Sequence, residues 1–235
     1  MATPWAELPP ASEISFVIGS GPSVDSFDNQ FLHNLMNQGT VFGINNVALD
    51  IPCHYNVRKS FGAETKLPEK LPDYEFANPN CKLIISEFDC GDSSRALSNL
   101  EIKGDYFFFS HRDNQSMGNI IWPEGDQIVV SWTTISSALH LAASLGSKVI
   151  YVIGNDMRGS NYSGYYQAPG PAYWQFRNQI ISVKNYLHTE FECSVVNLSP
   201  FSGLGYTSDN VSKLKVSMGK IQYFLKFHLF DRWRL

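Results

Sequence analysis

The amino-acid sequence predicts an α/β protein in which helices cover both faces of a mostly parallel β-sheet. Several runs of residues are almost continuously apolar, which is typical of strands buried on both faces. Helical patterns alternate with these runs, as they do where crossover helices connect parallel strands. Polar and glycine-rich clusters follow the runs, and such sheets bind ligands beyond the carboxyl ends of their strands. We therefore expect a Rossmann-like sheet with a site along its carboxyl edge.

The chain is expected to enter this sheet with a strand, a turn and a helix. Residues 14–18 are β-branched and aromatic, and a glycine turn follows them. Ser23 and Asp25 are suitable helix N-caps, and apolar residues then recur at helical spacing until Gly39. The sequence therefore predicts a helix between the glycine turn and Gly39.

Four more short apolar runs in the first half of the chain predict strands. They lie at residues 41–44, 55–57, 82–85 and 106–109. Residues 59–80 are rich in proline and charge, which predicts a surface loop. Weak helical spacing around residues 95–100 predicts a short helix there.

The second half of the chain carries the strongest local pattern. Thr133 and Thr134 precede a helix rich in alanine and leucine, and an apolar strand at residues 149–153 follows it. Residues 157–172 form too long a connection for an ordinary turn, which indicates a lid or acceptor loop. The remaining expected elements are a helix at 173–188, a strand at 194–198 and a basic, aromatic C-terminal helix within 211–235.

Composition bounds the protein class. The 235 residues are 43% hydrophobic, 14% aromatic and 17% charged, which excludes a disordered, collagen-like or coiled-coil chain. We expect one Rossmann-like domain over residues 1–235. The apolar runs are too short to span a membrane, and the N-terminus lacks the pattern of a secretory signal. The four cysteines lack the spacing of a zinc site, so reduced thiols and a cytoplasmic location are expected.

The charge is unevenly distributed along the chain. The formal net charge is −4, but residues 211–235 hold six basic residues against Asp231 alone, a local +5 that leaves −9 for the rest. Aromatic residues are interleaved with these lysines and arginines. A docked amphipathic helix explains this pattern, and so does contact with an anionic membrane surface or a nucleic acid. The net charge therefore does not exclude an anionic partner.

The glycine turn after the first strand is the first candidate binding element. Glycines allow backbone amides to approach an anion closely, and the start of the next helix adds partial positive charge. The pattern matches neither a dinucleotide fingerprint nor a Walker-type loop, and a plain structural turn explains it equally well. Its candidate nucleotide-binding residues are Gly19, Ser20, Gly21, Pro22 and Ser23.

Three other polar clusters follow strands or begin a helix. Asn45 and Asn46 carry amides that hydrogen-bond a base or ribose, although turns also favour asparagine. Thr133 and Thr134 stand where hydroxyls cap a helix or bind phosphate. Gly154, Asn155 and Asp156 place a carboxylate at a strand end.

The order of these motifs resembles that of the bacterial lipooligosaccharide sialyltransferases. It is similar as well to the superfamily that contains archaeal hydroxymethylpterin pyrophosphokinases and flagellin-modification glycosyltransferases. The resemblance runs from about residue 14 to residue 202, and residues 133–156 match without a gap.

The resemblance implies a metal-independent glycosyltransferase that uses a nucleotide-sugar donor and no other cofactor. The glycine turn, Asn45 or Asn46, Thr133 and Thr134 would hold the nucleotide together with Gly154. Family tyrosines after the aspartate stabilise the departing phosphate, a role that falls here to Tyr162, Tyr165 or Tyr166. Arg158 stands where one of these tyrosines would fall, and arginine is a sound phosphate ligand.

The family's catalytic histidine is missing from residues 173–177. Transfer to a hydroxyl needs a group that accepts its proton, so Asp156 and His111 become the candidate bases. His188 lies close by in sequence, but it stands at the end of a predicted helix and is better explained as a cap.

Other readings of the site stay open. A pyrophosphokinase of the hydroxymethylpterin type would need ATP and Mg²⁺, yet residues 54–59 lack the aspartate common in that branch. A non-catalytic nucleotide-binding module is the third reading. The acceptor is expected to be a glycan or a hydroxymethylated DNA base, and a homo-oligomer is left open.

Overall fold

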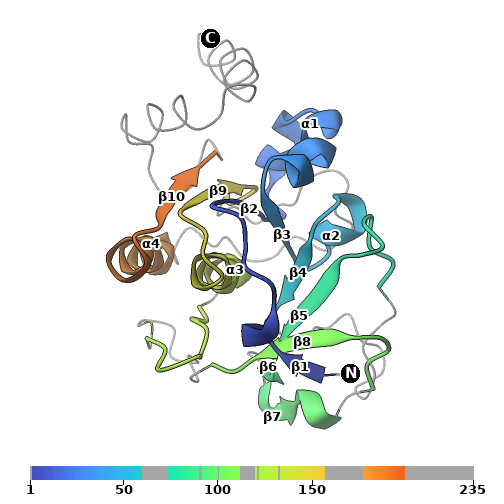
Figure 1. Ribbon diagram of the computed structural model, residues 1–235, viewed down its shortest axis with the longest axis vertical. Coiled ribbons are helices and arrows are strands. Elements are labelled where there is room, and N and C mark those ends of the chain that lie inside the picture. Colours follow the sequence, from blue (N-terminus) through green and yellow to red (C-terminus); the bar gives the residue numbers. More distant parts are fainter. Residues whose placement is uncertain are drawn as a thin grey trace.

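A computed structural model confirms the predicted α/β architecture, with eight parallel strands in one sheet (Figure 1). The strands are β1 (Ala2–Pro4), β2 (Ile14–Ile18), β3 (Thr40–Ile44), β4 (Tyr55–Arg58), β5 (Lys82–Ser86), β8 (Tyr106–Phe109), β9 (Val149–Ile153) and β10 (Ser194–Asn197). The structure describes residues 2–59, 74–89, 92–99, 101–111, 120, 122–131, 133–156 and 177–198. The predicted lid at 157–172 and the basic helix within 211–235 lie outside these residues.

The strand order places a change of direction in the middle of the sheet. The order is β1-β8-β5-β4-β3-β2-β9-β10, and each neighbouring pair is parallel. From β2 the chain builds outward through β3, β4, β5 and β8, and it then returns to the other side of β2 to form β9 and β10. In open α/β sheets the crevice at such a switch point is the usual ligand site. Here it lies between the carboxyl ends of β2 and β9.

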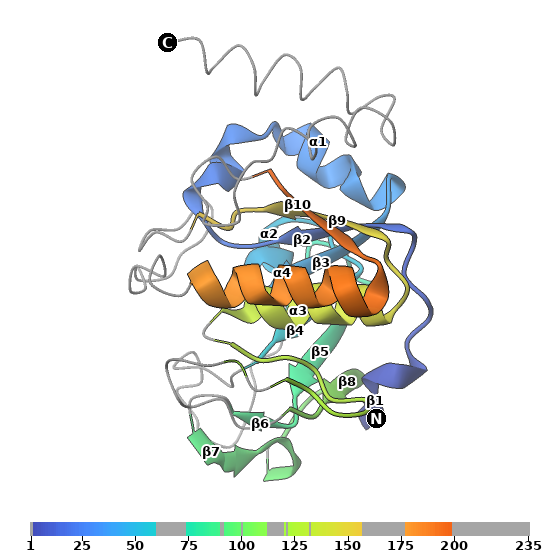
Figure 2. The same cartoon turned by 90° about the vertical axis from the view of Figure 1, so that its left-hand side faces the viewer.

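Helices cover both faces of the sheet (Figures 1 and 2). On one face lie α3 (Thr134–Ser144) and α4 (Arg177–Phe191), which run side by side. The opposite face is covered by η2 (Pro22–Ser26), α1 (Asn29–Asn34), η3 (Leu35–Asn37) and α2 (Val47–Asp50). Each face of the sheet has its own hydrophobic core. In β2, Val17 packs into the core under α3 and α4, whereas Phe16 and Ile18 pack into the core on the opposite face. The nearly continuous apolar runs of the sequence therefore serve two cores.

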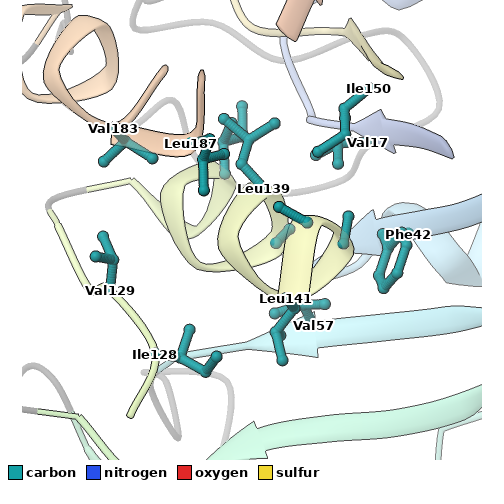
Figure 3. Close-up of a cluster of buried hydrophobic side chains, with 14 of the residues drawn as sticks. Val17, Phe42, Val57, Ile128, Val129, Leu139, Leu141, Ile150, Val183 and Leu187 are labelled. Carbon is teal, nitrogen blue, oxygen red and sulfur yellow. The ribbon is translucent and has the colours of Figure 1, made fainter. Parts of the chain in front are cut away.

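Helix α3 is buried along almost its whole length. Every residue from Thr134 to Ala143 is buried. Figure 3 shows Leu139 of α3 close to Leu187 of α4, with Val17 and Ile150 of the sheet on another side. Ile128 and Val129, from the segment that precedes α3, complete the same core. Enclosure on all sides favours small and apolar residues, which explains the alanine and leucine content of α3. The helix also buries the polar residues Ser136, Ser137 and His140.

The first helix of the chain is shorter than expected and is capped elsewhere. The structure has α1 from Asn29 to Asn34, followed by the 3₁₀ turn η3. Its cap is Asp28, whose carboxylate accepts from the amides of Gln30 and Phe31. Ser23 and Asp25, the predicted caps, lie within the 3₁₀ turn η2 instead. The local pattern predicted the helix correctly, but it missed Asp28 as the capping residue.

Two short elements differ from expectation. The helix predicted around residues 95–100 is confirmed only as the 3₁₀ turn η4 (Leu97–Asn99). Residues before it form β7 (Asp92–Ala96), which pairs antiparallel with β6 (Phe88–Asp89). Strand β1 was not predicted, since three residues that end in Pro4 carry no periodicity. A proline fits an edge strand, and β1 pairs only with β8.

Other expectations concern membranes and cysteines. Within the described residues no helix is both long and apolar enough to cross a membrane. Cys53, Cys81 and Cys193 are free thiols, and burial raises the pKa of Cys81 and of Cys193 to about 12. Cys90 lies outside the described residues.

His140 on α3 is a buried histidine with a structural role. It is 3% exposed, and its Nδ1 accepts a hydrogen bond from the Val129 amide at 2.9 Å. Its ring forms T-shaped contacts with the rings of Tyr186 and Phe191. Burial lowers the pKa of His140 to about 4, so the native protein keeps this ring neutral at pH 7.

We predict that acidification destabilises the protein through His140. The native pKa of about 4 lies below the ordinary 6.5, so between these values the unfolded chain binds a proton that the native state does not. The contribution of neutral His140 to the unfolding free energy is fully present above the ordinary pKa of 6.5 and is lost as the pH falls towards 4. From pH 7 to pH 5 this group should remove about 2 kcal/mol of unfolding free energy.

Denaturant unfolding at several pH values tests this effect. His140→Asn keeps an acceptor for the Val129 amide and should flatten the loss between pH 7 and pH 5. The matched control is His188→Asn, which changes an exposed histidine of α4 and should leave the pH dependence intact. An unchanged slope in His140→Asn would refute the assignment.

Candidate functional site

The loops that follow β2 and β9 meet at the switch point of the sheet. The Gly19 amide donates to the Ile153 carbonyl at 2.7 Å, and the Gly21 amide donates to the Gly154 carbonyl at 2.8 Å. These two bonds continue the pairing of β2 with β9 beyond the ends of both strands. The glycine turn and the Gly154–Asp156 cluster therefore form one structural unit.

Glycine is required on both sides of this contact. A Cβ on Gly19 would lie 2.6 Å from the Gly154 carbonyl oxygen, and one on Gly154 would collide with the Gly19 carbonyl oxygen. A Cβ on Gly21 would collide with Oδ2 of Asp156. Gly154 also has φ +71°, a left-handed conformation that side chains disfavour. The close approach that these glycines permit is between two backbones.

Most backbone amides of the glycine turn are bonded within the protein and are not left for an anion. The amides of Gly19, Gly21 and Ser23 all donate to protein oxygens, and Pro22 has no N–H. Within the described residues, Ser20 is the member of the turn whose amide donates to no protein group. The turn thus offers a ligand fewer backbone donors than its sequence suggests.

Asp156 ties the two loops together through its side chain. The carboxylate is 2% exposed, and its Oδ2 accepts from the Ser23 amide at 2.7 Å. The Ser23 hydroxyl is buried next to this bond and has no hydrogen-bond partner among the described residues. A buried hydroxyl without a partner is unfavourable in the protein alone, and a polar ligand at this edge would satisfy it.

Asn45 and Asn46 follow β3 and are held by β4. Asn45 has φ +49°, and its carbonyl accepts from Asn56 Nδ2 at 2.6 Å and from Arg58 Nη2 at 2.9 Å. Arg58 Nη2 also donates to Asn46 Oδ1 at 2.7 Å. The two asparagines are half-buried at the carboxyl edge, next to the loop that follows β2. Their conformation is therefore set by residues of the neighbouring strand.

The start of α3 joins the same edge. Thr133 occupies the N-cap position, but its side chain makes no capping hydrogen bond. Its backbone amide donates to Ser131 Oγ at 3.2 Å. Thr134 Oγ1 lies 3.5 Å from Asn45 Oδ1. Ile135 follows, and its Cδ1 would lie 2.9 Å from a Cβ on Gly19. Thr134 thus reaches the loop after β3, and Ile135 the loop after β2.

His111 does not join this group. It follows β8, and four strands separate β8 from β9 in the sheet order. With about 4.8 Å between neighbouring strands, the ends of β8 and β9 are about 24 Å apart. Nε2 of His111 lies 3.4 Å from the Phe88 carbonyl oxygen instead. His111 and Asp156 therefore cannot act on the same proton, and Arg158, Tyr162 and Tyr165 lie outside the described residues.

Sequence analysis missed three residues at the end of β4: Asn56, Arg58 and Lys59. Arg58 is 3% exposed, with its guanidinium carbon 4.0 Å from the centre of the Tyr74 ring. Lys59 Nζ donates to the Ser131 carbonyl, just before α3. The sequence signal that could have found them was the three polar residues of Asn-Val-Arg-Lys at the end of a predicted strand.

Comparisons with known proteins place the fold. No family model and no curated protein matches the chain. The structure is similar to the MAf glycosyltransferase from Magnetospirillum magneticum AMB-1, with a TM-score of 0.51 and 14% identity over 97% of this chain and 40% of that one. The chain thus spans less than half the length of that protein. This likeness shows that the α/β fold also occurs in a glycosyltransferase.

Weaker likenesses reach sialyltransferase structures. One is the sialyltransferase CST-II in complex with a trisaccharide acceptor and CMP, with a TM-score of 0.39 and 15% identity over 86% of this chain and 98% of that one. Another is CstII from Campylobacter jejuni in complex with cytidine-5'-monophosphate, with a TM-score of 0.37 and 14% identity over 88% of this chain and 99% of that one.

We predict that Gly154→Ala is much more destabilising than a matched glycine substitution elsewhere. Gly125 has a similar φ of +64° but open space around it, whereas Gly154 at +71° faces the Gly19 carbonyl. The left-handed conformation alone should cost Gly125→Ala about 1 kcal/mol, and the added clash should bring Gly154→Ala to about 3 kcal/mol. Unfolding free energies from denaturant titrations measure both. Equal losses would show that the loops separate easily and that the contact is unimportant.

Proposed function

We propose that the protein is a glycosyltransferase that uses a nucleotide-sugar donor and transfers the sugar to an acceptor hydroxyl. Two contacts at the carboxyl edge of the sheet carry this proposal. The Ser23 amide bonds Asp156 across the switch point between β2 and β9, and Thr134 Oγ1 meets Asn45 Oδ1 at the end of the neighbouring strand β3. The reaction class comes from the resemblance of the motif order to sialyltransferases. The name of the Magnetospirillum protein with the same fold supports it.

The donor nucleotide would lie over the ends of β2 and β3. Its phosphate would face the start of α3, where the dipole of an eleven-residue helix favours negative charge. The Ser20 amide and the buried Ser23 hydroxyl would donate to phosphate or sugar oxygens. Asn45 would bind the nucleoside half, since its amide both donates and accepts.

The reaction forms one bond and breaks another. The acceptor oxygen bonds to the anomeric carbon as the bond from that carbon to the donor phosphate breaks, and the acceptor proton passes to a base. We propose that Arg158, Tyr162 and Tyr165 stabilise the departing nucleotide by charge and hydrogen bonding without a metal ion. The proposed acceptor is a glycan or a hydroxymethylated DNA base. The basic residues of 211–235 suit DNA, because its phosphate backbone is anionic.

The proposal is tested first with nucleotides. A ligand bound to the native state raises the melting temperature by mass action, so we expect a shift with one of CMP, UDP, GDP or ADP that is the same with Mg²⁺ and with EDTA. The matching nucleotide-sugar should slowly release its nucleotide. A shift with ATP only in the presence of Mg²⁺, together with AMP release, would replace this proposal with diphosphate transfer. Binding without turnover on any donor would indicate a nucleotide-binding module.

Two substitutions locate the nucleotide. Ser23→Ala and Thr134→Val remove hydroxyls at the carboxyl edge. Each should raise the apparent Kd for the nucleotide about tenfold, which is seen as a smaller shift of the melting temperature. The control is Ser15→Ala, which removes the buried hydroxyl bonded to Ser147 at the amino end of β2. It should lower the melting temperature but leave the Kd unchanged. Normal binding in both edge variants would place the nucleotide elsewhere.

The role of Asp156 is decided by comparing two variants. We propose that Asp156 positions the loops, because it is buried and bonded to the Ser23 amide. Asp156→Asn keeps an oxygen for this amide and should retain most nucleotide release, whereas Asp156→Ala should lose about 1–3 kcal/mol of stability and the nucleotide shift. A folded Asp156→Asn protein that binds nucleotide normally but transfers no sugar would make Asp156 the catalytic base.

A further inference from the structure

Arg58 is a buried cation that the proposed reaction does not use directly. It ends β4 and spreads its donors over three oxygen atoms. Nε donates to Asn56 Oδ1 at 2.9 Å, while Nη2 donates to the Asn45 carbonyl at 2.9 Å and to Asn46 Oδ1 at 2.7 Å. The Tyr74 ring lies against the guanidinium. At 3% exposure, such a group is costly to bury and needs this many partners.

These contacts act on the backbone of Asn45 as well as on side chains. Asn45 has φ +49°, which is strained for a residue with a Cβ and persists only where the surroundings hold it. Three bonds hold it: its amide donates to the Val57 carbonyl at 3.1 Å, and its carbonyl accepts from Arg58 and from Asn56. Asn56 is itself oriented by Arg58. Arg58 therefore acts on Asn45 both directly and through Asn56.

We infer that Arg58 is a positioning residue for nucleotide recognition. By fixing the carbonyl of Asn45 and the side chain of Asn46, it sets the polar groups that the ends of β3 and β4 present beside Thr134. The ligand class is that of the proposed function, a nucleoside phosphate, so this part of the inference rests on that function. Arg58 acts on the site through Nε and Nη2, which donate to the three asparagines, so its role does not require contact with the ligand.

Lysine cannot replace arginine in this role. A planar guanidinium holds several acceptors at fixed angles, whereas an ammonium is a flexible point charge with a different reach. Arg58→Lys keeps the charge but loses the simultaneous bonds to Asn45, Asn46 and Asn56. Arg58→Gln removes the charge and keeps a polar side chain. If the cation alone mattered, the lysine variant would behave like the wild type.

The positioning is tested without any nucleotide. Hydrogen exchange of the Asn45 amide, measured by NMR, reports its bond to the Val57 carbonyl at the β3–β4 edge. We expect Arg58→Lys to speed this exchange at least about tenfold while the amides within β2 keep their protection. The control Leu187→Ala truncates a buried side chain of α4 in the same core as α3, away from the bonds among Arg58, Asn45 and Asn56. It should lower the melting temperature without selectively freeing Asn45.

The recognition is tested with the nucleotide of the panel CMP, UDP, GDP and ADP that shifts the wild type most. Arg58→Lys and Arg58→Gln should each raise its Kd at least about tenfold, and Leu187→Ala should leave the Kd within about twofold. Unchanged exchange at Asn45 in Arg58→Lys would overturn the positioning. Faster exchange with an unchanged Kd would overturn the link to recognition. If the wild type binds no nucleotide, the proposed function fails, and the exchange measurement still decides the positioning.

Discussion

The close approach of two backbones at the switch point is the constraint on which the candidate site depends. The loops after β2 and β9 are joined by amide-to-carbonyl bonds at Gly19 and Gly21 and by the Asp156 carboxylate on the Ser23 amide. A side chain at any of the three glycine positions would push the loops apart. These bonds use most of the backbone amides in the glycine turn, so the main role of the turn is to connect the two loops. Whatever it binds must use the donors that remain.

The buried helix α3 positions the remaining residues of the site relative to the connected loops after β2 and β9. Its body is enclosed by the sheet, by α4 and by the segment with Ile128 and Val129, so its start is fixed relative to the strand ends (Figure 3). That start places Thr134 beside Asn45 and Ile135 beside Gly19. The core and the candidate site therefore share one helix, and a change in either is transmitted to the other through a well-packed interior.

Polar residues at the end of β4 support the residues that follow β3 and precede α3. Asn56 and Arg58 are buried, and Lys59 is half-buried. Arg58 and Asn56 hold the asparagine pair, and Lys59 holds the chain just before α3. Desolvating a guanidinium is unfavourable, and an apolar side chain of similar size is often no less stable. A buried arginine at this place is better explained by the fixed geometry that it gives to a polar edge than by any gain in stability.

The sequence by itself determined the fold class, seven of the eight strands of the sheet and the body of α3, because periodicity and apolar runs are local properties. It also pointed to Ser23, Asn45 and Thr134 as polar residues at element ends. Only the tertiary structure decided which ends meet. Strand order placed His111 far from Asp156, the loop contact engaged the amides of the glycine turn, and β4 brought Arg58 behind the asparagines. These outcomes depend on pairings between residues distant in the chain, which no local pattern encodes.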